Sequence, residues 1–181
     1  MMKTILRYAA GFLVLGFLWH AGSVLLGEEL LPRPVATTAL FFERLATAEF
    51  WGHIGISFAR LLAGLFVALA TAQALDPSYL QAFLSMGGTK REAVRHVYLP
   101  ALLPSLFTSL KVASGTAMAV LFLAESFATT SGLGYLIMDA WGMGDVEGMF
   151  VDILAMSLLG LFFYLALGLL ERIFVPWRGA N

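Results

Sequence analysis

The chain of 181 residues contains no cysteine, which excludes disulfide bonds and thiol chemistry. Charged residues are also scarce, at 13% against about 25% in soluble globular proteins. No Walker-type glycine loop occurs, so ATP is not bound by that route. The three histidines, at positions 20, 53 and 96, are too scattered along the sequence to suggest a metal cluster. No catalytic set emerges, and we expect neither an enzyme nor a cofactor nor a nucleic-acid partner.

Apolar residues are plentiful instead, at 60% of the chain with a mean hydropathy of +0.84. Four stretches reach the roughly 20 residues that cross a hydrocarbon core of about 30 Å. They are residues 8–26, 54–75, 102–127 and 149–173. The predicted fold class is therefore all-α: a polytopic membrane protein with about four transmembrane helices in the lipid bilayer. We expect a single transmembrane domain over residues 1–181, with the first span kept as an anchor rather than cleaved as a signal.

The basic residues are distributed unevenly between the two sides of these spans. Seven of the eleven precede span one, follow span two or follow span four: Lys3, Arg7, Lys90, Arg91, Arg95, Arg172 and Arg178. The positive-inside rule makes that side cytoplasmic. Both termini and the loop at 76–100 are therefore predicted to lie inside.

The cytoplasmic loop at 76–100 contains signals for two short helices. Asp76 is a suitable N-cap, with Pro77 at the first helical position. The glycines at 87–88 would end this helix. Thr89 and Glu92 have the spacing of a capping box, in which each side chain bonds the other's backbone N–H. The loop is thus predicted to be a helix, a glycine joint and a second helix that stops near residues 99–100.

The segments on the outer side have their own signals. Pro34 disfavours helical geometry at Arg33, so the first span cannot continue through this point. Residues 36–49 have helical periodicity and are expected to lie flat on the outer surface. Residues 131–137 form a small-residue turn and a short apolar segment. Three glycines within 142–148 are expected to keep the chain loose before the last span.

Several ionisable residues lie in or near the spans. Arg60 and Lys111 are long enough to reach an interface, and Asp152 is expected at one. Glu125 reaches less far, and two interpretations stay open. Its carboxyl group either forms a buried hydrogen bond to the backbone of 131–134 or contacts a translocation path. In the second case the path or its gate would include Glu125, Ser131, Gly132, Gly134 and Tyr135, because irregular backbone at membrane depth must line a protein cavity.

The spacing within 81–100 resembles the EAA loop of ABC importer permeases, written EAA-x3-G-x9-I-x-LP. The corresponding residues are Gln81, Ala82, Phe83, Gly87, Val97, Leu99 and Pro100, and Leu84 shares an apolar helix face with Phe83. Further matches resemble the nitrate/sulfonate/taurine group of these permeases. They are Leu-Pro-x-Pro at 31–34, the Ser57, Arg60, Gly64 pattern, Ala124-Glu125 before Ser-Gly-Leu-Gly-Tyr-Leu-Ile at 131–137, and Glu171-Arg172.

The resemblance implies a permease subunit of a bacterial inner-membrane importer. The loop at 81–100 would bind a cytoplasmic ABC ATP-binding subunit, and ATP hydrolysis would reside in that subunit. A second copy of the permease, an extracytoplasmic solute-binding protein and a small anionic solute such as a sulfonate, taurine or nitrate are also implied.

The chain departs from the family in its length. Family members usually have six spans, and the two missing spans are expected between residues 68–72 and 76. Gln81 and Phe83 also replace an acid and a small residue of the loop motif. Two alternatives stay open: a shortened, non-transporting paralogue that acts as an ATPase-binding or assembly protein, and an unrelated four-helix membrane protein.

Overall fold

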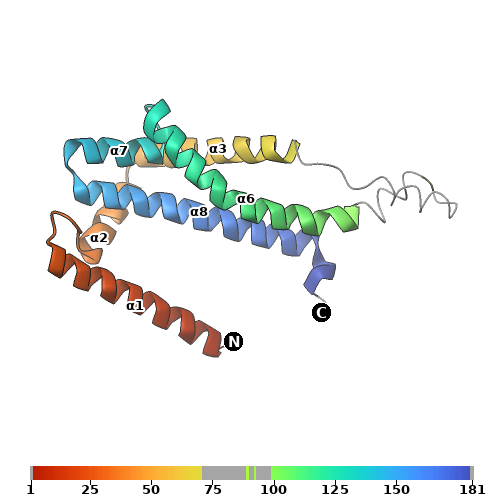
Figure 1. The fold of residues 1–181 in the computed structure, drawn as a ribbon, viewed down its shortest axis with the longest axis horizontal. Helices are drawn as coiled ribbons and strands as arrows, with labels where there is room; N and C mark the ends of the chain where they lie inside the picture. Colours follow the sequence, from red (N-terminus) through yellow and green to blue (C-terminus); the bar gives the residue numbers. More distant parts are fainter. Residues whose placement is uncertain (1, 71–88, 90–91, 93–98, 180–181) are drawn as a thin grey trace. The chain divides into compact units, whose positions relative to one another are not determined.

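The computed structural model describes residues 2–70, 89, 92 and 99–179. Within these residues it has six α-helices, one short 3-10 helix and no strand, which confirms the all-α fold class. The α-helices, labelled in Figure 1, are α1 (Met2–Leu26), α2 (Pro34–Leu45), α3 (Ala48–Ala70), α6 (Leu99–Ala128), α7 (Leu133–Met143) and α8 (Val146–Phe174). The 3-10 helix η2 (Pro176–Gly179) follows α8.

Two of the described helices are long and apolar enough to cross a membrane by length and composition. They are Leu102–Ala128 within α6 and Val146–Phe174, which is α8. A shorter apolar helix covers Ala10–Leu26. The second predicted span coincides with α3 as far as Ala70. The count of four spans therefore stays a prediction.

The chain divides into two compact units, each with its own apolar core. The first unit comprises Met1–Ser57 and Phe122–Leu158, and the second comprises Phe58–Leu121 and Leu159–Asn181. The buried apolar residues of the first unit are Phe50, Leu133, Ile137, Ala140, Val151, Ala155 and Met156. Those of the second are Leu61, Leu65, Phe107, Leu110, Leu121, Leu159, Phe163, Leu167 and Val175.

The break before α2 is as predicted, but the helix that follows is shorter than expected. Arg33 is extended (φ −67°, ψ 138°) and Pro34 occupies the first helical turn. However, α2 ends at Leu45, and a turn at 46–47 separates it from α3. The last carbonyls of α2 find other donors there: Thr47 Oγ1 donates to Arg44 O (2.7 Å) and Trp51 Nε1 donates to Leu45 O (2.8 Å). The last carbonyl groups of a helix have no donor within the helix itself. Here the side chains of Thr47 and Trp51 supply donors to two of them.

The expectation of a loose stretch at 142–148 is wrong. Helix α7 continues to Met143 and ends at Gly144, whose positive φ of 75° gives a left-handed C-cap. The N–H of Asp145 then donates to Ala140 O (2.9 Å), as in a tight helix end. In turn, Asp145 Oδ1 accepts the N–H of Gly148 (2.8 Å) and caps the start of α8. One glycine and one aspartate therefore join two helices directly.

Candidate functional site

A buried carboxyl group organises the first unit. Glu125 is 0% exposed, as is Ser57 of α3. The Ser57 hydroxyl lies 2.9 Å from Oε1 and 2.8 Å from Oε2 of Glu125, and it donates to this carboxyl group. The N–H of Gly134 donates to Glu125 Oε2 (3.0 Å). The first of the two interpretations, a buried hydrogen bond to the 131–134 backbone, is therefore confirmed.

The N-terminus of α7 is capped by side chains of other helices. Gly132 N donates to His53 Nδ1 (3.0 Å), Leu133 N to Ser57 Oγ (2.8 Å) and Gly134 N to Glu125. The first N–H groups of a helix have no partner within the helix itself. Three consecutive donors thus each have an acceptor from α3 or α6. We call these five residues, His53, Ser57, Glu125, Gly132 and Gly134, with the Leu133 N–H, the Glu125 cluster.

Both glycines of the cluster are required by the close approach of α6. Gly132 has φ +111°, and a Cβ there would collide with the Glu125 carboxyl group. A Cβ on Gly134 would lie 2.7 Å from Glu125 Cβ and 2.9 Å from Phe122 O. Side-chain-bearing residues rarely adopt such a backbone, and real Cβ atoms do not approach so closely. The Ser-Gly-Leu-Gly sequence is therefore what lets α7 begin against Glu125.

The structure brings together most of the residues proposed for a path or gate. Glu125, Gly132 and Gly134 are in direct contact, and the Tyr135 ring stacks on His53 with centroids 6.1 Å apart. Ser131 takes part differently, because its carbonyl oxygen accepts the Thr129 hydroxyl (2.8 Å). Whether these residues form a path or gate stays a prediction.

The sequence alone indicated no capping role for His53 or Ser57. Ser57 belongs to a motif resemblance, and His53 is one of three scattered histidines. Their spacing of four residues on a helix places both side chains on one face, which is the signal that indicates a shared partner.

A second polar contact joins α2 to α8. Asp152 of α8 is 0% exposed, and its expected place at the membrane interface stays a prediction. Its Oδ1 lies 2.8 Å from Nη1 of Arg44, whose Nη2 is 3.5 Å from Asp145 Oδ2. A cavity of about 270 Å³ adjoins Arg44 and the cluster residue His53. Its remaining lining residues are Thr47, Glu49, Phe50 and Leu136.

In the part of the chain that the structure describes, no group of three or more His, Asp or Glu side chains could hold a metal ion.

Most of the predicted ATPase-coupling residues lie outside the described residues: Gln81, Ala82, Phe83, Leu84, Gly87 and Val97. Leu99 and Pro100 open helix α6. The capping box is confirmed. Thr89 N donates to Glu92 Oε2 (2.9 Å), and Glu92 N donates to Thr89 Oγ1 (3.4 Å).

Apolar helices of membrane-spanning length and a short helix capped by buried side chains define an all-α membrane protein. Its residues 34–175 match the family described as "Binding-protein-dependent transport system inner membrane component". The chain belongs to this family.

Three curated relatives show how the chain compares in length. The formylaminopyrimidine transport permease protein ThiX of Halalkalibacterium halodurans is 30% identical over 148 residues, which cover 80% of this chain and 58% of ThiX. The taurine transport system permease protein TauC of Escherichia coli is 28% identical over 112 residues, 62% of this chain and 41% of TauC. The chain thus spans about half the length of these two relatives. No solved structure shows significant similarity to it.

The third relative matches almost from end to end. The putative aliphatic sulfonates transport permease protein SsuC of Escherichia coli is 24% identical over 249 residues, covering 98% of this chain and 95% of SsuC. This chain has 181 residues, so at least 68 aligned positions have no residue in it. Because both sequences are covered almost completely, these positions are missing from within the match rather than beyond its ends.

Proposed function

We propose that this chain is the membrane-spanning permease subunit of an ABC importer for a small anionic solute, such as a sulfonate, taurine or nitrate. The coupling loop at 76–100 binds a separate ATP-binding subunit on the cytoplasmic side. An extracytoplasmic binding protein delivers the solute, and two copies of the permease enclose the path. Both termini lie in the cytoplasm, and the chain resides in a bacterial inner membrane.

The observation that carries this proposal is the family match over residues 34–175, which includes the whole coupling loop. The names of TauC and SsuC support the solute class, since they refer to taurine and aliphatic sulfonates. The capping box between Thr89 and Glu92 supports the predicted start of the second loop helix. Helix α6 joins the end of this loop to Glu125 in a single helix, Leu99–Ala128. A displacement of the loop would therefore act on α6 and, through Glu125, on the N-terminus of α7.

The coupling loop is tested by detergent pull-down of the tagged full chain with an ABC ATP-binding subunit from the same genome. We expect the wild-type chain to retain the subunit and Gly87→Trp to lose it, because the indole would hold the backbone of the loop away from the surface of the ATP-binding subunit. Gly142→Trp is the matched control, since Gly142 is exposed on α7 with open space where its Cβ would be. Equal retention by both variants, or no retention by the folded wild type, would refute the coupling proposal.

A second function is favoured by the alignment with SsuC. At least 68 positions of that match are absent from this chain, which suits a shortened paralogue that binds an ATPase without conducting solute. Uptake of taurine by proteoliposomes that contain chain, ATPase and binding protein separates the two. Uptake that requires ATP supports the permease, whereas ATPase binding without uptake supports the shortened paralogue.

A further inference from the structure

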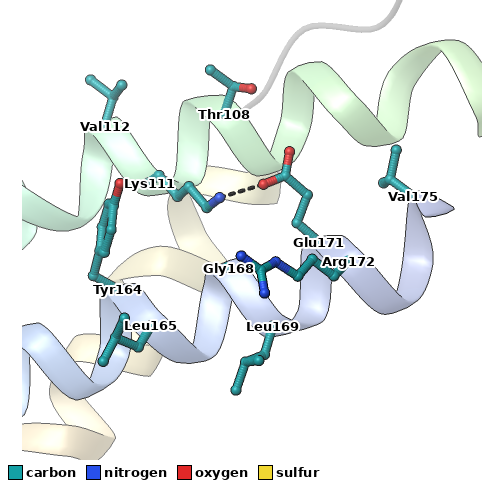
Figure 2. Close-up of a pocket in the computed structure, with 10 residues that line it drawn as sticks. All are labelled: Thr108, Lys111, Val112, Tyr164, Leu165, Gly168, Leu169, Glu171, Arg172 and Val175. Carbon is teal, nitrogen blue, oxygen red and sulfur yellow. Dashed lines mark hydrogen bonds and ion pairs between the residues drawn. The ribbon is translucent and has the colours of Figure 1, made fainter. Parts of the chain in front are cut away.

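A pocket of about 910 Å³ with both charged and apolar lining residues lies between α6 and α8 in the second unit (Figure 2). Lys111 of α6 forms an ion pair with Glu171 of α8. Arg172, the next residue on α8, also lines the pocket, and the structure gives it no ion pair among the described residues. Two cationic groups and one carboxylate leave this pocket with an excess of one positive charge.

The same pocket has an apolar part along the two helices. Val112, Leu165 and Leu169 line it, and they are 74%, 54% and 59% exposed. Arg172 lies seven residues beyond Leu165 on α8, which is about 10 Å along a helix. The charged groups therefore lie toward the C-terminal end of α8, with Val175 beyond them, and Leu165 extends the apolar part of the pocket toward the middle of the helix.

This order of polar and apolar groups coincides with the end of a membrane-spanning helix. Arg172 precedes the end of α8 by two residues, and Trp177 follows in η2 with 48% of its surface exposed. Arginine and tryptophan at a helix end mark the interface between hydrocarbon and water. The apolar part of the pocket then lies at the level of the acyl chains, and the charged part at the level of the headgroups.

We propose that this pocket binds an anionic phospholipid. The phosphate accepts hydrogen bonds from the Arg172 guanidinium, whose planar fork suits phosphate oxygens, and from a Lys111 N–H that does not bond Glu171. An acyl chain covers Leu165 and Leu169. A soluble anion would satisfy the charges but would leave this apolar surface bare, which is why we assign the site to a lipid. Basic pockets between membrane helices on the cytoplasmic side are known to bind such headgroups.

The test is a native mass spectrometry titration of the detergent-solubilised full chain with phosphatidylglycerol and with phosphatidylcholine of the same acyl chains. A basic residue near the membrane surface contributes about 1 kcal/mol to anionic lipid binding, which is about fivefold in affinity. We expect tighter binding of phosphatidylglycerol, and a fall of about fivefold in Arg172→Gln with no change for phosphatidylcholine. Arg172→Lys keeps the charge and should keep most of the preference. Arg33→Gln is the matched control, since Arg33 is an exposed arginine paired with Glu28 in the first unit.

Three outcomes would overturn the proposal. They are equal affinity for the two lipids, a preference that survives Arg172→Gln, or a loss of equal size in Arg33→Gln. A further titration uses methanesulfonate as a soluble anion. Saturable binding of it that Arg172→Gln abolishes, without any preference for phosphatidylglycerol, would assign the pocket to a solute instead. None of these readouts requires an ATPase or transport, so the lipid site and the permease function can fail independently.

Discussion

Replacement of Glu125 by alanine tests the central feature of the first unit. The substitution removes the acceptor of two buried donors, the Ser57 hydroxyl and the Gly134 N–H. A buried donor left without a partner costs about 1–3 kcal/mol, so two cost about 2–6 kcal/mol. Hydrogen bonds between helices in bilayers are weaker, at about 0.6 and at most about 1.7 kcal/mol each. The two ranges overlap at about 2–3 kcal/mol, which is the loss we expect in the free energy that holds α7 in place.

The absence of cysteine from the chain offers a direct assay of this loss. A single cysteine introduced by Ala140→Cys would be buried, because Ala140 on α7 is only 7% exposed. Its thiol reacts with a maleimide when α7 detaches. A loss of 2–3 kcal/mol raises the population of the detached state about 30- to 150-fold, since about 1.4 kcal/mol corresponds to a factor of ten. The labelling rate in detergent should rise by a similar factor in Glu125→Ala.

Two further variants make this assay specific. Glu125→Gln keeps one acceptor oxygen for the Gly134 N–H and offers an amide that the Ser57 oxygen can accept, so labelling should remain close to wild type. Phe127→Ala truncates a side chain on the same helix that is 76% exposed, and it should have little effect. If Glu125→Ala labels no faster than Phe127→Ala, the cluster does not hold α7. If Glu125→Gln labels as fast as Glu125→Ala, loss of the hydrogen-bond acceptors does not explain the detachment of α7.

Three other predictions concern Gly134, the Arg44–Asp152 pair and the capping box at Thr89. Gly134→Ala should lower the unfolding midpoint in SDS strongly, because its Cβ would lie 2.7 Å from a side-chain carbon and 2.9 Å from a carbonyl oxygen of α6. Gly142→Ala on the same helix has open space and should be neutral or stabilising by up to about 1 kcal/mol. Arg44→Ala leaves the buried Asp152 carboxyl unpaired and should cost about 3–5 kcal/mol in the same unfolding assay, whereas combining it with Asp152→Leu should recover most of this loss. Thr89→Ala removes a helix cap worth about 1 kcal/mol, so amide exchange at Glu92 should become faster; unchanged exchange would contradict the capping box.

The sequence predicted features that depend on neighbouring residues. The hydropathy pattern anticipated α1, α3, α6 and α8, and Pro34 located the start of α2. Such signals are local, because helix length, proline geometry and caps are decided within a few positions.

The sequence did not predict partners that are brought together only by packing. Arg44 and Asp152 are separated by 108 positions, and no signal in the sequence indicated that they pair. The pairing of His53 with the Gly132 N–H likewise depends on how α7 begins. Glycine content misled the expectation for 142–148, since only Gly144 there has a positive φ.

The division into units bears on the choice between a working permease and a shortened paralogue. Every residue of the Glu125 cluster belongs to the first unit, which contains no residue between Ser57 and Phe122. The missing spans are predicted between 68–72 and 76, which lies within the sequence range of the second unit, Phe58–Leu121. The residues of the cluster and of the Arg44–Asp152 pair therefore lie outside the segment in which the missing spans are predicted. A chain that fails to transport should still show slow labelling of Ala140→Cys and fast labelling once Glu125 is replaced by alanine. Loss of uptake together with an intact cluster would then exclude misfolding of the first unit as the cause and would favour the shortened paralogue.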